Sequence, residues 1–255
     1  MSTHARIMAV ALVSLAACSG SKNPAIPTES NALVPQSISS ADFKRVAAWG
    51  SNGQKAVAQC PQGYRVVAGG SSSSDGSSVG TGVPDSTHTA WVVKPQSSVS
   101  AEAFASCLRT SLARKTFRWL SAAASSGLAA AQCRPNYMLV TGYGTGTVTT
   151  SWFNPATNTY WVGGGGTAFA SCARLGSGIV IKHAWNKSQK PKNVFAGCGD
   201  GYTVIAGAMG DNAWPGPPIQ QHPGIPASPG RHGYTGWWTF SNAQNELTWA
   251  ACVKG

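Results

Sequence analysis

The stretch AQCPQGYRVVAG, at residues 58–69, recurs twice in altered form, as AQCRPNYMLVTG at 131–142 and AGCGDGYTVIAG at 196–207. Each version contains a cysteine, a three-residue turn, a tyrosine, an aliphatic run and a glycine. Aliphatic and β-branched runs bounded by turn residues are typical of β-strands. Because a missed repeat misassigns a whole fold, this internal similarity is the observation from which we predict the architecture.

Each copy continues to a Trp-bearing strand and closes on FASC (104–107), FASC (169–172) or WAAC (249–252). A further strand candidate precedes each copy, at 43–46, 117–120 and 179–182. This pattern predicts four strands per copy, with the copies at about 42–109, 116–174 and 179–254. We therefore expect residues 42–255 to form a single all-β domain with a threefold internal repeat of four-stranded units.

Tryptophans mark the third predicted strand of each copy: Trp91, Trp161 and either Trp237 or Trp238. Their equivalent positions predict that they pack in the core, since large aromatic rings contribute much of the apolar area that a fold buries.

Six cysteines lie inside the predicted domain, and six cysteines allow fifteen pairings. Two of those sets respect the threefold repeat. The favoured set repeats one staple three times and pairs Cys60 with Cys107, Cys133 with Cys172 and Cys198 with Cys252. The other set joins the last cysteine of each copy to the first of the next and closes Cys252 onto Cys60, and it stays open as the alternative.

Four strands repeated three times fit a β-prism or a β-trefoil, whereas propellers normally have four or more blades. The repeats, with an opening such as CPQGY (60–64) and a closing apolar-x-x-Cys, resemble those of the vitelline membrane outer layer family. The resemblance implies a β-prism of three Greek-key sheets, and it carries no catalytic residues to this chain. The second copy departs from the motif at Asn136, so the β-trefoil is kept as the alternative.

The N-terminus has the layout of an export signal, with Arg6 followed by an apolar stretch up to Ala17. Its end, LAAC at 15–18, resembles the lipobox of bacterial lipoproteins. The resemblance implies removal of residues 1–17 and attachment of acyl chains, such as palmitate, to Cys18. An ordinary cleaved signal peptide with an incidental cysteine is the alternative. Acylation would also explain why the chain has an odd number of cysteines.

Residues 18–41 are polar and proline-containing, which predicts a flexible tether. The expected location is the cell envelope, as an outer-membrane lipoprotein held by its lipid anchor. The outer membrane is favoured by resemblance to other lipoproteins, because Ser19 follows the acylated cysteine. The sequence does not indicate whether the domain faces the periplasm or the cell surface.

Few sets of side chains could form a catalytic site, because the chain of 255 residues has only eight acidic residues. Two carboxylate pairs, Asp200 with Asp211 and Asp75 with Asp85, are the candidates for a hydrolase, which is the third-ranked function. The chain's cysteines are already assigned to disulfide bridges or to the lipid, and its histidines lack metal-ligand spacing. We therefore expect no enzyme activity, no cofactor and no metal.

Aromatic residues and cations favour a binding module instead. Trp152 and Trp214 fall in inserts of loop composition, where an aromatic ring is suited to stacking on a sugar. Lys187, Lys190 and Lys192 belong to a basic surface, and the formal net charge is +11. Such a surface attracts polyanions.

These residues predict an envelope or surface lipoprotein that binds a glycan or another anionic envelope polymer, without nucleic acid as a partner. The alternative function is a structural subunit of an envelope, pilus or secretion assembly.

Overall fold

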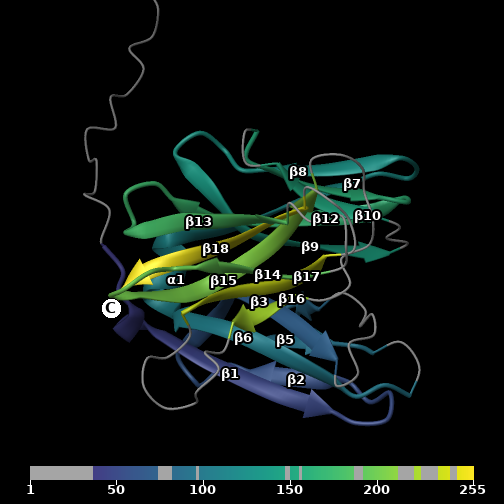
Figure 1. The fold of residues 1–255 in the computed structure, drawn as a ribbon, viewed down its shortest axis with the longest axis horizontal. Helices are drawn as coiled ribbons and strands as arrows, with labels where there is room; N and C mark the ends of the chain where they lie inside the picture. The colour runs from purple at the N-terminus through teal and green to yellow at the C-terminus, as the bar shows by residue number, and fades with distance from the viewer. Residues whose placement is uncertain are drawn as a thin grey trace, which may run out of the picture. The chain divides into compact units, whose positions relative to one another are not determined.

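Antiparallel strands make up nearly all of the regular structure in the computed structural model (Figure 1). The structure describes residues 37–73, 82–95, 98–146, 150–154, 157–186, 192–211, 221–224, 235–241 and 246–255. These residues all belong to one compact unit, Pro35–Gly255. The prediction of an all-β fold is confirmed.

Eighteen strands in the described residues fall into three units of six. The first unit follows the 3-10 helix η1 (Ser40–Asp42) and contains β1 (Phe43–Gly50), β2 (Ala56–Gln59), β3 (Tyr64–Ser73), β4 (Val83–Pro84), β5 (Ala90–Val93) and β6 (Ala101–Arg109). Helix α1 (Thr110–Thr116) leads to the second unit, with β7 (Phe117–Ala123), β8 (Leu128–Gln132), β9 (Tyr137–Gly146), β10 (Thr150–Asn154), β11 (Thr159–Gly163) and β12 (Gly166–Arg174). The third unit contains β13 (Ile179–Asn186), β14 (Lys192–Gly197), β15 (Tyr202–Asp211), β16 (Gln221–Gly224), β17 (Gly236–Ser241) and β18 (Glu246–Lys254).

Strand pairing follows the same order in every unit. The first, sixth and third strands pair as β1-β6-β3, β7-β12-β9 and β13-β18-β15, and the second, fifth and fourth pair as β2-β5-β4, β8-β11-β10 and β14-β17-β16. The prediction of four strands per unit was wrong. Each unit has six strands, and the second and fourth of these were not predicted. The second strands of the first two units are rich in alanine, which is depleted in strands, and the fourth strands lie in the variable inserts.

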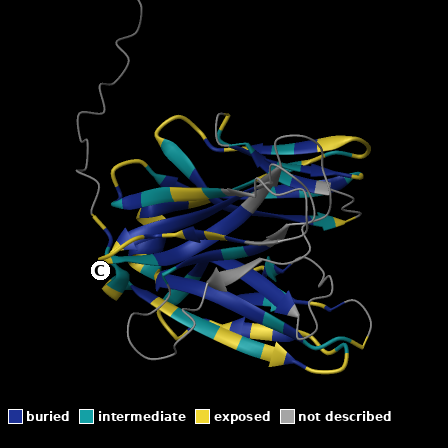
Figure 2. Cartoon of the chain, in the orientation of Figure 1, coloured by how far each residue is buried: buried dark blue, intermediate teal, exposed yellow. Residues whose placement is uncertain are grey.

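A β-bulge occurs at the same place in the third strand of each unit. The register of β3, β9 and β15 against the sixth strand skips Val67, Val140 and Ile205. A bulge re-aims a side chain, and all three of these aliphatic residues enter one central core that the three units share. Figure 2 shows this interior as buried positions on strands from every unit.

Three smaller clusters of buried residues accompany the central core, and each contains the disulfide that joins the two sheets of one unit. The bridges are Cys60–Cys107, Cys133–Cys172 and Cys198–Cys252, which is the favoured pairing. In each case the first cysteine directly follows the second strand and its partner lies in the sixth. The staples therefore hold together two sheets that share no strand.

The glycine of the repeated motif lies beneath an aromatic ring of the fifth strand. A Cβ built on Gly69 would lie 2.0 Å from a ring atom of Trp91, and one on Gly207 equally close to Trp237. In the second unit the corresponding pair is Gly142 and Tyr160, at 2.2 Å. The aligned aromatic is therefore Tyr160 and not Trp161, since a shift of one residue moves a strand side chain to the other face.

Neighbouring units meet in a closed order: β4 lies against β9, β10 against β15, and β16 against β3. The last contact includes a strand pairing between Gln221 and Ser71, which merges two sheets into the six-stranded sheet β1-β6-β3-β16-β17-β14. Hydrogen bonds also cross the junctions. Ser171 Oγ donates to the carbonyl of Val67 at 2.6 Å, for example.

Candidate functional site

Two adjoining cavities lie where the first and second units meet. The first, of about 360 Å³, is lined by β3, α1, β7 and the turn between β4 and β5. The second, of about 420 Å³, lies between β4 and the sheet β7-β12-β9. Both volumes fall within the range of about 300–1,000 Å³ that is usual for ligand pockets. His88 and Trp119 line both cavities, which we call together the junction groove.

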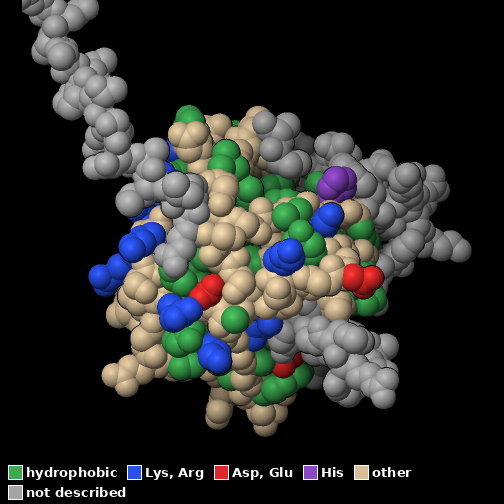
Figure 3. Space-filling model, turned by 90° about the vertical axis from the view of Figure 1, so that its left-hand side faces the viewer, with side chains coloured by type: hydrophobic (Ala, Val, Ile, Leu, Met, Phe, Trp, Pro, Cys, Tyr) green, Lys and Arg blue, Asp and Glu red, His purple; other side chains and the backbone are tan. Residues whose placement is uncertain are grey.

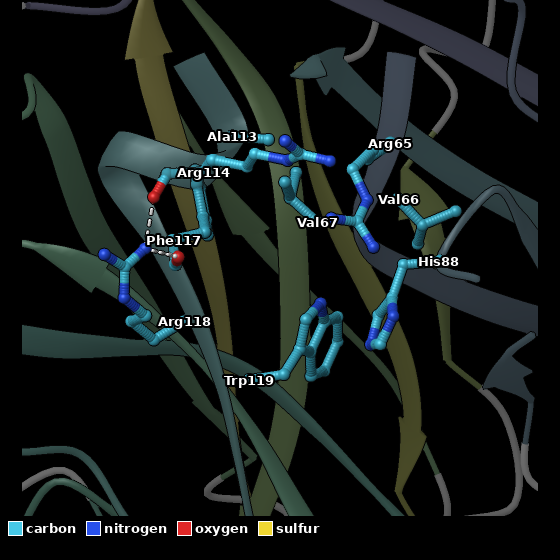
Figure 4. Close-up of a pocket in the computed structure, with 9 residues that line it drawn as sticks. All are labelled: Arg65, Val66, Val67, His88, Ala113, Arg114, Phe117, Arg118 and Trp119. Carbon is cyan, nitrogen blue, oxygen red and sulfur yellow. Dashed lines mark hydrogen bonds between the residues drawn. The ribbon is translucent and has the colours of Figure 1, made fainter. Parts of the chain in front are cut away.

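Helix α1 forms one wall of the groove. It is anchored by Leu112, Ala113 and Thr116, which are buried. Its C-terminal carbonyls are capped by Arg118, whose guanidinium donates to the carbonyl of Arg114 and, at 2.8 Å, to that of Phe117. Helix ends leave carbonyls without intrahelical partners, and a basic side chain satisfies them. Arg118 thus fixes the helix and does not point into the cavity (Figure 4).

Two guanidinium groups converge over the first cavity. In Figure 4 the Arg114 side chain extends toward Arg65, and the Arg65 guanidinium points toward His88, so that both lie at the same end of the cavity. Arg65 is held by a hydrogen bond from its Nη2 to the carbonyl of Thr87 at 2.8 Å. The single ion pair among the described residues joins Arg109 to Asp42, so neither groove arginine has a carboxylate partner there. Two like charges at one cavity create a positive potential that favours an anion.

His88 forms the aromatic floor of the groove together with Trp119. The two ring centroids are 5.7 Å apart, with an angle of 37° between the planes. His88 has a φ of 57°, a left-handed backbone conformation that is uncommon outside glycine. Burial lowers the pKa of His88 below its ordinary value, and the charge of Arg65 lowers it further, against a smaller opposing effect of Asp85. The imidazole is therefore mostly neutral near pH 7.

Asp85 lines the second cavity, but its carboxylate is occupied by its own turn. Oδ1 accepts the backbone N–H groups of Thr89 and Ala90 at 2.6 and 3.0 Å. Oδ2 accepts the hydroxyl groups of Thr87 and Thr89, also at 2.6 and 3.0 Å. Burial raises the pKa of Asp85, but these hydrogen bonds outweigh it and bring the pKa below its ordinary value. Asp85 therefore shapes the turn that presents His88.

In each carboxylate pair predicted for a hydrolase, the structure describes the side chain of only one member. Asp200 is exposed in the turn before β15. Asp75 lies outside the described residues, and the side chain of Asp211 is not among those described.

Aromatic side chains line the second cavity. Tyr143 and Phe169 stack with their ring centroids 4.5 Å apart and an interplanar angle of 3°. Trp119 packs edge-on against Tyr143, with a centroid distance of 5.6 Å. Ser121 and Tyr143 are the cross-strand neighbours of Phe169 on either side, so one row of the sheet forms the floor of the cavity.

The three units provide an internal comparison for this groove. By strand register, the place of Trp119 is taken by Arg45 in the first unit and by Ile181 in the third. The guanidinium of Arg45 donates to the carbonyl of Val204 instead, at 2.6 and 3.0 Å. The place of α1 is taken between the second and third units by the short connection Leu175–Gly178. Arg65 likewise corresponds to Met138 and Thr203. The groove residues are therefore particular to the first junction and are not part of the repeated pattern.

The binding residues predicted from the sequence lie elsewhere or outside the described residues. Trp152 lies in strand β10 and not in a loop, and it stacks on its cross-strand neighbour Trp161, with ring centroids 5.6 Å apart. Trp214, Lys187 and Lys190 lie outside the described residues, as does Cys18. Lys192 begins β14, and its side chain is not described. Among these residues only Trp152 has a described side chain, and it does not line the groove.

Sequence reasoning overlooked Arg65, Arg114, His88 and Trp119 as a group. One signal was available, because Arg65 is a charged residue inside an otherwise apolar repeated motif. The proximity of these four side chains could not be predicted from the sequence, since they come from three separate segments of two units.

No cluster of three or more His, Cys, Asp or Glu side chains suited to a metal ion occurs in the described part of the chain. None of the helices in that part is long and apolar enough to cross a membrane. The chain matches no protein-family model, and no curated protein shows significant sequence similarity to it. The groove itself is therefore the feature that points to a function.

Proposed function

We propose that this protein is a non-enzymatic binding module that captures an acidic glycan in the junction groove. The observation that carries the proposal is the convergence of Arg65 and Arg114, without carboxylate partners in the described residues, over the ring pair of His88 and Trp119. An acidic sugar matches both features, because its carboxylate or ester anion suits a guanidinium and the apolar face of its ring suits an indole.

Long-range charge supports the same class of ligand. The formal net charge is +11, and Figure 3 shows Lys and Arg side chains at several separate places on one face, where they outnumber the acidic ones. A positive field raises the rate at which polyanions arrive, whereas the groove supplies shape. The only acidic side chain among the groove lining residues, Asp85, is committed to its turn, which favours binding over acid–base chemistry.

We also propose that the module is acylated at Cys18 and held in the cell envelope, at the outer membrane, and that its three units close into a β-prism. The LAAC stretch at 15–18 supports the first part, and the closed order of contacts between units supports the second. Replacing Cys18 by Ser is expected to release folded protein from the membrane fraction, which fractionation and intact mass would reveal.

The function is tested by titrating the detergent-solubilised full chain with oligogalacturonate and with its methyl-esterified, uncharged form. We expect the variant with Arg65→Ala and Arg114→Ala to bind oligogalacturonate at least about tenfold more weakly, since hydrogen bonds to charged groups contribute about 1.5–3 kcal/mol each. The control, Arg134→Ala with Lys254→Ala, removes two exposed cations elsewhere and should retain affinity within about threefold, because a surface field is diffuse. Equal losses in both variants, or equal binding of the esterified sugar, would contradict the proposal.

A further inference from the structure

The second cavity differs in chemistry from the first, although the two share His88 and Trp119. The cations lie at the first cavity, where Arg65 and Arg114 converge. The residues that line the second include no Lys or Arg. It combines the rings of Tyr143 and Phe169 with the hydroxyl-bearing residues Ser86, Ser121 and Thr145. The groove therefore runs from an end with two arginines to an aromatic end, whose one carboxylate, Asp85, is held by hydrogen bonds of its own turn.

A surface of aromatic rings and hydroxyl groups is suited to binding uncharged sugars. Their C–H faces pack on aromatic rings, and their hydroxyl groups exchange hydrogen bonds with side-chain hydroxyls. A purely aliphatic ligand would instead cover the polar groups of Ser121 and Thr145 without replacing their hydrogen bonds with water, which is unfavourable. Each cavity also lies at the small end of the usual range for ligand pockets, which suits one ring in each.

We propose that the second cavity is a subsite for a neutral sugar, so that the groove takes an acidic oligosaccharide with an acidic residue next to an uncharged one. This inference rests on the proposed function, since it assumes that the arginines hold the acidic residue. Trp119 and His88 lie between the two subsites and contact both rings. The preferred ligand is thus a heteropolymer in which acidic and neutral sugars adjoin, which should bind more tightly than a polymer of acidic residues alone.

Ser121 offers a way to block the second cavity selectively. It is exposed on β7, it lines the second cavity and it does not line the first. Ala123 lies two residues further along the same strand, is also exposed and lines neither cavity. Ser121→Trp should therefore fill the second cavity, and Ala123→Trp is the matched control for placing an indole on this strand.

The experiment measures the affinity of the full chain for glucuronic acid and for a disaccharide of glucuronic acid and a neutral hexose. We expect the disaccharide to bind about fivefold to tenfold more tightly than the monosaccharide, which is the gain typical of one aromatic contact. Ser121→Trp should remove this gain, so that the two sugars bind to it with equal affinity. Ala123→Trp should behave like the unmodified chain.

The outcomes separate the two proposals. If neither sugar binds, the proposed function fails. If the monosaccharide binds and the disaccharide gains nothing, or the gain survives in a folded Ser121→Trp variant, the groove binds anions and the neutral subsite is refuted. Should Ser121→Trp not fold, as judged by its thermal transition, the comparison of the two sugars on the unmodified chain decides the matter.

Discussion

Single residues at repeated positions set the geometry of each unit. The bulge residues Val67, Val140 and Ile205 direct one aliphatic side chain per unit into the shared core. The motif glycines provide the space that an aromatic ring of the fifth strand fills. His88 is not one of these repeated residues. In the corresponding turn of the second unit, the residue with a left-handed backbone conformation is Asn158. The amide of Asn158 serves the backbone, donating to the carbonyl of Tyr137 at 2.6 Å.

His88 should make stability depend on pH. Because the folded protein lowers its pKa, the unfolded chain binds more protons below the ordinary value of about 6.5. Stability contributed by neutral His88 is therefore present above that value and is lost as the pH falls toward the lowered pKa. We expect His88→Asn, which also tolerates a positive φ, to show a smaller loss on acidification.

Urea unfolding of both proteins between about pH 8 and about pH 5 would measure this difference. As the pH falls, the free energy of unfolding should decrease more for the unmodified chain than for His88→Asn. A constant offset across the whole interval would show that His88 does not titrate differently in the folded and unfolded states.

Among the elements, α1 separates the first junction from the second. Thr110 and Leu175 occupy the same place, since each donates its backbone N–H at 2.8 Å to the turn that precedes the third strand, at Gly63 or Asn136. From there seven residues form α1 in one junction, whereas Leu175–Gly178 suffices in the other. The helix is thus an addition that brings Arg114 to the groove and Leu112 to the central core.

Replacing Thr110–Thr116 by a second copy of Leu175–Gly178 should leave the fold intact and abolish the site. Loss of the buried Leu112 side chain is expected to lower the free energy of unfolding by about 1.5–3 kcal/mol. Oligogalacturonate binding should fall at least about tenfold, because Arg114 is removed. Urea unfolding and calorimetric titration measure the two effects, with Lys115→Ala, an exposed cation of the same helix, as control. Unchanged binding by the folded graft would place the site elsewhere.

At the scale of the whole molecule, the three units depend on one another. The central core takes side chains from every unit, and hydrogen bonds cross between units. Contact between the third and first units includes the guanidinium of Arg45, which donates twice to the carbonyl of Val204. A closed arrangement of this kind should unfold as one cooperative system.

Arg45→Met should therefore lower the stability of the entire molecule in a single transition. The expected decrease is about 1.5–3 kcal/mol, because hydrogen bonds from a charged donor are lost. Lys44→Met removes a neighbouring exposed cation and should change stability by less than about 0.5 kcal/mol. Differential scanning calorimetry distinguishes these cases. A second transition in Arg45→Met would indicate that the units unfold independently.

The sequence alone determined the all-β class, the positions of the motif strands and the symmetric pairing that it favoured for the cysteines. Those features are local or periodic: turn residues bound short apolar runs, and equal motifs predict equal structures. It did not reveal the alanine-rich second strands, because alanine has no strand preference and their pairing with the fifth strands decides their conformation. Alignment of the repeats also assigned Trp161 in place of Tyr160 as the buried aromatic of the second unit, since the face on which a strand residue lies depends on register.

Tertiary structure alone decided where the candidate site lies. Arg65, His88, Arg114 and Trp119 belong to a strand, a turn, a helix and the first strand of another unit, and only the docking of two units brings them together. No sequence period relates them, because they are differences between repeats and not their common features. The repeated residues encode the scaffold through local rules, whereas the unrepeated residues acquire their chemistry from the neighbours that folding places beside them.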